Sequence, residues 1–171
     1  MRIVALARES HKQGRTAFHC GRPKLDDWLA RRATQYRKND LAQTYLLIDD
    51  AREPPKVAGF YALSSASIQP DDWPADLRGP RGKNHPLPVI LLGQLAVDRG
   101  YAGRGYASDL LVDALHRAAL VGEQIGTAAV IVDALDQSAV QFYKHHGFQP
   151  LPSHPLRLLR PLKSIRDLLE L

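Results

Sequence analysis

The chain of 171 residues has a single cysteine, Cys20, and no long run of apolar residues. One cysteine cannot form an intrachain disulfide, and without a cluster of Cys and His it argues against a structural zinc site. We therefore expect no metal centre and a reducing, cytoplasmic environment. The apolar run in residues 1–8 is too short for a signal peptide, and no stretch approaches the roughly 18 apolar residues of a membrane span.

Acidic residues are fewer than basic ones, 18 Asp and Glu against 23 Lys and Arg, which gives a net charge of +5. A basic balance favours polyanions such as nucleic acid, anionic lipid or a phosphorylated cofactor. Many basic proteins bind none of these, so charge alone leaves the partner open. The content of 44% hydrophobic and 24% charged residues is ordinary for a globular protein, and the length suits one domain over residues 1–171.

Hydrophobic periodicity and turn residues predict the order of the elements. We expect strands at 1–8, 43–48, 56–68, 89–97, 127–133, 148–151 and 156–159, and helices at 23–38, 106–121, 136–147 and 163–171. The strands at 43–48 and 56–68 read as an antiparallel hairpin, and the continuous apolar strand at 89–97 as buried on both faces. The proline-rich segment 69–88 predicts an ordered loop or a short helix near residues 73–77.

A glycine-containing loop between the strand at 89–97 and the next helix is the main candidate for chemistry. Gly103 and Gly105 let the backbone turn sharply and approach a ligand closely. Unpaired N–H groups and the helix dipole suit a diphosphate at this point, although a tight turn without a ligand explains the glycines equally well. A P-loop needs Gly-Lys-Ser/Thr, which the sequence lacks, and a Rossmann loop follows an early strand, whereas this loop lies past mid-chain.

Two segments resemble the signatures of the GNAT acetyltransferases. Residues 102–107, Ala-Gly-Arg-Gly-Tyr-Ala, are similar to the coenzyme A loop Gln/Arg-x-x-Gly-x-Gly/Ala, with Ala102 in the place of Gln or Arg. Residues 136–148 resemble the family's Asp/Asn-x-x-Ala-x-x-Phe-Tyr…Gly-Phe segment. This resemblance covers residues 42–151. Residues 18–29, 89–98 and 130–134 are further similar to the GNAT toxins of toxin–antitoxin pairs, many of which have Arg where this chain has Gln94.

The resemblance implies an α+β (α/β) fold in one GNAT domain. Its central mixed, mostly antiparallel sheet is flanked by helices and splays in a V between two central strands. It also implies an N-acetyltransferase that uses acetyl-CoA and needs no metal. Its toxin members acetylate the α-amine of aminoacyl-tRNA, block translation, are homodimers and are neutralised by an antitoxin with a ribbon-helix-helix domain. The basic balance agrees with a tRNA partner.

The same resemblance assigns the site residues. The family's pantetheine arm lies along the strand at Leu95, Ala96 and Val97, and one N–H there, such as that of Val97, polarises the thioester carbonyl. The cofactor residues of the loop and of the later segment are Ala102, Gly103, Arg104, Gly105, Tyr106, Ala107 and Phe142. Tyr143 is the candidate general acid, because a phenol with a pKa near ~10 is protonated at neutral pH. The residues alone favour Tyr143 as a core aromatic beside Phe142, and only the resemblance reverses this interpretation for Tyr143.

Other reactive side chains receive no catalytic role. An α-amino group has a pKa near ~8, so part of it is already neutral at physiological pH. Whether a dedicated base acts stays open, and His85, His145 and His146 are left unassigned. Cys20 lacks an identifiable His or Asn partner and reads as a structural thiol. Several basic residues could together contact tRNA phosphates, although each one by itself is more simply explained as a solvated surface residue. They are Arg31, Arg32, Arg37, Lys38, Arg78, Arg81, Lys83, Arg157 and Arg160.

Two alternatives to the toxin hypothesis stay open. The first is an ordinary GNAT enzyme that acetylates a small amine or a protein N-terminus. The second is a degenerate, non-catalytic GNAT fold that only binds a partner, for which Ala102 is the supporting residue.

Overall fold

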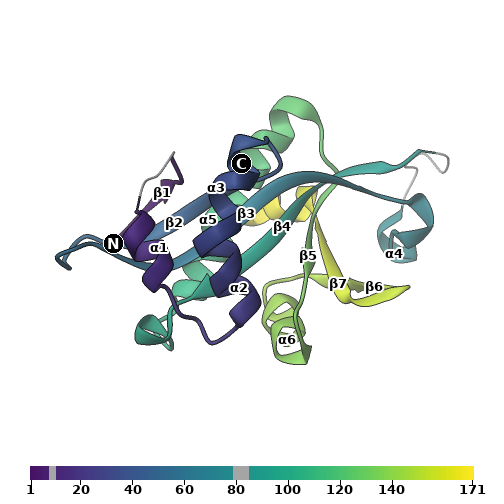
Figure 1. The fold of residues 1–171 in the computed structure, drawn as a ribbon. Coiled ribbons are helices and arrows are strands. Elements are labelled where there is room, and N and C mark those ends of the chain that lie inside the picture. The colour runs from purple at the N-terminus through teal and green to yellow at the C-terminus, as the bar shows by residue number, and fades with distance from the viewer. Residues whose placement is uncertain (8–10, 79–84) are drawn as a thin grey trace. The chain divides into compact units, whose positions relative to one another are not determined.

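The computed structural model describes residues 1–7, 11–78 and 85–171, and its strands within these ranges form one seven-stranded sheet of order β1-β2-β3-β4-β5-β7-β6 (Figure 1). The strands are β1 (Arg2–Ala5), β2 (Gln43–Asp49), β3 (Lys56–Ile68), β4 (Leu87–Val97), β5 (Ala129–Asp133), β6 (Gln149–Leu151) and β7 (His154–Pro161). The helices are α1 (Lys12–Ala17), α2 (Pro23–Asp27), α3 (Ala33–Lys38), α4 (Ala75–Arg78), α5 (Tyr106–Ile125), α6 (Gln137–His145) and α7 (Leu162–Leu169). Shorter helical segments are η1 (Trp28–Arg32), η2 (Pro70–Asp72) and η3 (Arg99–Tyr101).

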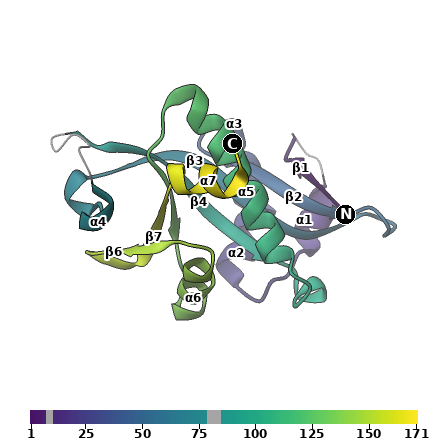
Figure 2. The same ribbon diagram turned by 180° about the vertical axis from the view of Figure 1, so that it is seen from behind.

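The chain divides into two compact units, and the first contains Met1–Ser64 and Gly93–Ala114. In it β1, β2 and β3 pair antiparallel, which confirms the predicted hairpin. Helices α1 to α3 cover one face of β2 and β3 (Figure 1), and a core of apolar side chains fills the space between them. Trp28 of this helical layer stacks on Phe60 of β3 with ring centroids 5.9 Å apart. The start of α5 covers the opposite face, where Leu110 lies against Gly59 (Figure 2).

The predicted helix at 23–38 forms, but with a wider turn in its middle. Pro23 occupies the first turn, where its missing N–H costs nothing. At η1 the backbone makes π-type turns, and the N–H of Ala33 donates to the carbonyl of Trp28, five residues earlier. The wider turn brings Trp28 and Ala33 to the same buried face, where the two residues are 7% and 0% exposed. Both side chains thereby reach the core of the first unit.

The second unit contains Ser65–Leu92 and Leu115–Leu171. Its β4 pairs parallel with β5 from Val89–Leu92 to Ala129–Val132, and β7 pairs antiparallel with both β5 and β6. One face carries a core around the buried Trp73, whose indole is 1% exposed. Helix α7 packs on the second half of α5 (Figure 2), where a Cβ on Gly122 would overlap a methyl of Leu162.

The architecture is the predicted one, a mixed and mostly antiparallel sheet flanked by helices. Val89, Ile90 and Leu92 of β4 are buried, whereas Leu91 and the residues 93–95 are half-buried, so the predicted burial on both faces holds only at the start of the strand. The strand runs on to Val97, beyond its last pair with β5. The segment 69–88 forms η2 and α4, whereas Arg81 and Lys83 lie outside the described residues, as does residue 8 of the first predicted strand. Helix α5 extends four residues beyond the predicted end at Val121, to Ile125. It stops at Gly126, whose φ of +70° suits a residue without a Cβ.

No helix in the described ranges has the length and apolarity needed to cross a membrane.

Candidate active site

The glycine-containing loop leads from β4 through η3 to α5 and contains two residues with a left-handed backbone. Gly103 has a φ of +73° and Gly105 a φ of +83°, a region in which a residue with a Cβ is strained. A Cβ built on either glycine would meet nothing within 4 Å, so both face open space. Backbone conformation, rather than packing, therefore requires the glycines, and the surface of the loop stays accessible.

The backbone N–H groups of this region fall into two sets. The first set donates to nearby carbonyl oxygens. It consists of the N–H groups of Tyr101 (2.9 Å) and Ala102 (3.3 Å) before the loop and of Ser108 (3.0 Å) after it. Those of Gly103 to Ala107 donate to no acceptor within the part of the protein that the structure describes. These five consecutive groups lie at the N-terminus of a 20-residue helix, where the helix dipole is positive. The arrangement is that of an anion site.

The side chains of Tyr101 and Arg104 fix the turn before the loop. Tyr101 is 6% exposed, and its hydroxyl donates to the Asp49 carboxylate at 2.7 Å. This hydrogen bond lowers the pKa of Asp49. The Arg104 guanidinium folds back over the Tyr101 ring, 5.4 Å from its centroid, and donates to the Gly100 carbonyl at 3.2 Å. The Arg104 side chain thus braces the turn, while its backbone N–H donates to no acceptor in the described protein.

Strand β4 presents the main-chain groups of alternate residues at its two edges. Asp98, directly after the strand, donates its N–H to a carbonyl of β3 at 2.9 Å. A Cβ on Gly59 of β3 would lie 3.0 Å from the Ala96 carbonyl oxygen, so Ala96 also directs its groups toward β3. Because successive residues alternate, Leu95 and Val97 direct theirs to the other edge. This orientation suits the expected contact of Leu95 and Val97 with a pantetheine arm, which stays a prediction.

Tyr143 lies on α6, a helix whose start is fixed by Asp136. The Asp136 carboxylate accepts the Ala139 N–H at 2.9 Å, which confirms the predicted N-cap. Tyr143 is 7% exposed and packs edge-on against Phe142 and Phe148, with centroids 5.2 and 5.6 Å away. Burial raises the pKa of Tyr143 to about 12, so its phenol is protonated at every physiological pH.

The family model described as acetyltransferase (GNAT) domain matches residues 42–150 of the chain. The chain belongs to the GNAT family of acetyltransferases. It is 40% identical over 154 residues to a tRNA-acetylating toxin of Mycobacterium tuberculosis, covering 90% of this chain and 89% of that protein. A structure of AtaT complexed with acetyl-methionyl-tRNAfMet matches with a TM-score of 0.89 and 27% identity over 98% of both chains. An AtaT mutant toxin bound to acetyl-CoA and the C-terminus of the antitoxin AtaR matches with a TM-score of 0.84 and 25% identity over 99% of this chain and 98% of that one.

Of the three unassigned histidines in this GNAT chain, His146 makes structural contacts close to Tyr143. His146 is half-buried, its Nδ1 lies 2.8 Å from the Phe142 carbonyl oxygen, and its ring packs on the Phe142 ring at 4.5 Å. His145 is exposed, as is His85. Phe142 is therefore half-buried between Tyr143 and His146, and its expected contact with the cofactor stays a prediction.

Cys20 is not an activated nucleophile. Burial raises the pKa of its thiol to about 11, and the nearby Asp26 adds to the effect. The thiol donates weakly to the Arg22 carbonyl at 3.7 Å. The prediction of a structural thiol thus agrees with the structure. No group of three or more potential metal ligands occurs among the residues that the structure describes.

The basic residues proposed for tRNA contact differ in how exposed they are. Arg31 is exposed on η1 and pairs with Asp27 at 3.0 Å. Arg157 pairs with Asp133 at 2.7 Å, in a bidentate arrangement. Arg160 is 8% exposed and donates to the His146 carbonyl at 2.7 Å, so its assignment to an exposed basic face is wrong. A buried guanidinium that satisfies a helix end is a structural residue.

Proposed function

We propose that this GNAT chain is an acetyl-CoA-dependent N-acetyltransferase that acetylates the α-amine of aminoacyl-tRNA and thereby blocks translation, as the toxin of a toxin–antitoxin pair. The observation that carries the donor site is the run of N–H groups from Gly103 to Ala107 that have no acceptor among the described residues. The tRNA-acetylating activity of the 40% identical relative supports the acceptor. The net charge of +5 suits a polyanionic acceptor.

The donor would be held by two main-chain elements. The N–H groups of the loop from Gly103 to Ala107 bind the diphosphate, because they lie at the positive end of α5 and have no acceptor in the described protein. The outward-facing groups of Leu95 and Val97 bind the pantetheine arm, and the Val97 N–H polarises the thioester carbonyl. Ala102 in place of Gln or Arg removes a side chain but no backbone donor, so it leaves this grip unchanged.

Tyr143 is assigned as the general acid. The amine nitrogen attacks the thioester carbon, the C–S bond breaks, the amine loses one proton, and the sulfur gains one. A phenol with a pKa of about 12 is a weaker acid than a thiol with a pKa near ~8.5. Full transfer of its proton to the thiolate is therefore uphill by about 5 kcal/mol. Tyr143 acts by a hydrogen bond that strengthens as charge develops on sulfur, and the proton that the amine releases completes the balance.

The remaining assignments follow from the same resemblance. Residues 1–171 act together as one catalytic domain. The protein works as a homodimer in the cytoplasm, where aminoacyl-tRNA is found, and an antitoxin with a ribbon-helix-helix domain neutralises it. Exposed cations of the helical layer, such as Arg31, Arg32 and Lys38, contact tRNA phosphates.

The test is to incubate the protein with labelled acetyl-CoA and total tRNA, either charged or deacylated, and to follow the label. The proposal expects label on charged tRNA alone, released with the amino acid by mild alkali. Label on small amines or peptides in the absence of tRNA would favour an ordinary GNAT enzyme. No acetyl-CoA binding by calorimetry would favour a non-catalytic fold.

A further inference from the structure

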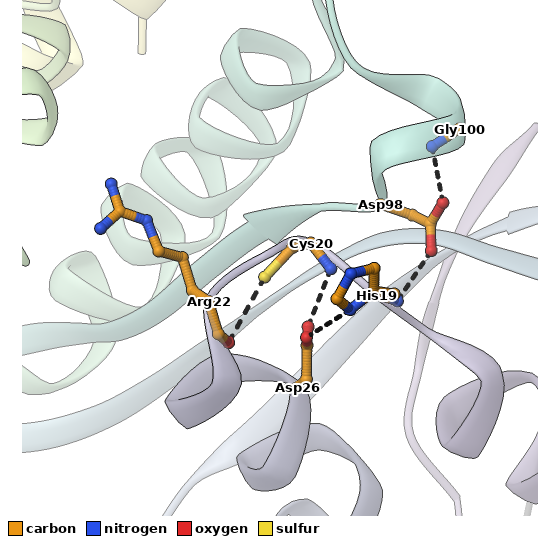
Figure 3. A network of polar contacts seen from close by, with 6 residues as sticks. All are labelled: His19, Cys20, Arg22, Asp26, Asp98 and Gly100. Carbon is orange, nitrogen blue, oxygen red and sulfur yellow. Dashed lines mark hydrogen bonds and ion pairs between the residues drawn. The ribbon is translucent and has the colours of Figure 1, made fainter.

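Two segments far apart in the sequence are joined in the first unit. The Asp98 carboxylate accepts the Gly100 N–H with one oxygen and the His19 N–H with the other, each at 2.8 Å (Figure 3). His19 precedes Asp98 by 79 residues. One side chain thus holds the turn that leads into the glycine loop and a point on the segment before α2.

The main chain reinforces this junction. The Arg99 N–H donates to the His19 carbonyl at 2.9 Å, so residue 19 is bound through both of its peptide groups. Gly21 has a φ of +87°, and a Cβ there would lie 2.5 Å from the Arg99 guanidinium. Only glycine allows Arg99 to approach this closely without a shift.

Asp26 fixes the same segment from its other side. Its carboxylate accepts the Cys20 N–H at 2.8 Å and lies 3.0 Å from His19 Nδ1 (Figure 3). Burial acts to raise the pKa of Asp26, but these contacts outweigh it and the pKa is lowered. The carboxylates of Asp26 and Asp98 therefore hold residues 19 and 20 between them, which makes the segment a firm support for the turn.

The turn continues directly into the five N–H groups of residues 103–107. Tyr101 donates its N–H to the Asp98 carbonyl at 2.9 Å, and Ala102 donates to the Arg99 carbonyl at 3.3 Å. Asp98 is the N-cap of this turn, η3. The backbone just before Gly103 is thus fixed through Asp98, while the following five N–H groups stay unpaired within the described protein.

We propose that Asp98 is a positioning residue that holds the diphosphate loop in its binding conformation by tying it to His19. The inference rests on the proposed binding of acetyl-CoA at residues 103–107. Binding to a loop whose N–H groups are already in place requires less ordering of the loop. The ligand therefore binds more tightly than it would to a loop that must first be ordered. Both oxygens of the Asp98 carboxylate accept N–H groups of the protein itself, so we expect Asp98 to act on donor affinity and not on the chemical step.

The test compares Asp98→Asn with wild type by calorimetry and steady-state kinetics. The amide has the same shape but only one acceptor oxygen, so one of the two N–H donors loses its partner. Acetyl-CoA Kd and KM should rise about tenfold, the effect of one hydrogen bond to a charged group, whereas kcat at saturating acetyl-CoA should change less than about threefold. Asp50→Asn is the matched control, because Asp50 is exposed, pairs only with Arg2 in the described structure and should leave both constants unchanged.

Gly21→Ala disturbs the same junction without altering Asp98, and should raise acetyl-CoA Kd in the same direction. It also tests the inference if Asp98→Asn fails to fold. The inference is overturned if folded Asp98→Asn and Gly21→Ala bind acetyl-CoA like wild type, or if kcat falls with Kd unchanged. A wild-type protein that binds no acetyl-CoA would overturn the proposed function itself, and the positioning role with it.

Discussion

Replacing Gly105 by Ala separates a role in ligand binding from a role in folding. Gly105 has a φ of +83°, and a Cβ there would meet nothing within 4 Å. The methyl group therefore causes no clash, and the folding cost is that of a left-handed alanine, about 1–2 kcal/mol. For a chain of this length each kcal/mol lowers Tm by about 2–4 °C. The variant should fold, with a Tm a few degrees below that of wild type.

The loss of affinity should be larger than this folding cost suggests. In the proposed function the N–H groups around Gly105 face the diphosphate, and the added methyl stands in the open space that the diphosphate needs. Losing or lengthening one hydrogen bond to an anion costs about 1.5–3 kcal/mol. Acetyl-CoA Kd, measured by isothermal titration calorimetry, should thus rise about 10- to 100-fold.

Gly126→Ala is the matched control. Gly126 has a φ of +70°, a Cβ there would also meet nothing within 4 Å, and it follows the other end of α5. Its replacement carries the same backbone strain but lies outside the loop, so Tm should fall by a similar amount and acetyl-CoA Kd should stay within about twofold. Equal acetyl-CoA affinity in the Gly105 and Gly126 variants would refute the reasoning, because backbone strain would then be the only role of Gly105.

The other predictions concern α6 and the pH dependence. Tyr143→Phe should lower kcat by at least about tenfold and leave acetyl-CoA Kd within about twofold, since only the hydroxyl is lost; wild-type turnover would remove Tyr143 from the mechanism. Because the pKa of Tyr143 is about 12, the pH profile of kcat/KM should rise through ~8 as the amine deprotonates, with no descending limb from Tyr143 below pH 10. Asp136→Ala should lower the free energy of unfolding by about 1 kcal/mol in urea titrations, because the N-cap is lost. Arg160→Met should cost about 1–3 kcal/mol in the same assay, since the His146 carbonyl loses its donor, and an unchanged urea midpoint in either variant would contradict its assigned contact.

Local patterns in the sequence predicted most of the elements. The turn residues at 49–55 separated the strands β2 and β3, the continuous apolar run located β4, and the Asp136 N-cap located the start of α6. Each of these signals acts within a few residues, so the order of neighbouring side chains is enough to read it. The glycines of the loop were likewise predictable, because φ values above zero at Gly103 and Gly105 reflect the backbone of their own turn.

Contacts between distant segments were not predictable in the same way. The bond from Tyr101 to Asp49 joins the turn after β4 to the end of β2. The bond from His19 to Asp98 joins the segment before α2 to the end of β4, so both depend on how distant segments pack. The only local signal for Asp98 is the spacing Asp-x-Gly, which is typical of an Asx turn. No pattern within β7 shows that the Arg160 guanidinium satisfies the end of α6, so the sequence predicts an exposed residue there.

Amide hydrogen exchange at residues 103–107 tests the central claim most directly. Without an acceptor in the described protein, these five N–H groups should exchange rapidly in the free enzyme. Saturating coenzyme A should slow their exchange at least about tenfold, whereas S-acetylpantetheine, which lacks the diphosphate, should not. Unchanged exchange at these residues in a protein fully loaded with coenzyme A would contradict the account.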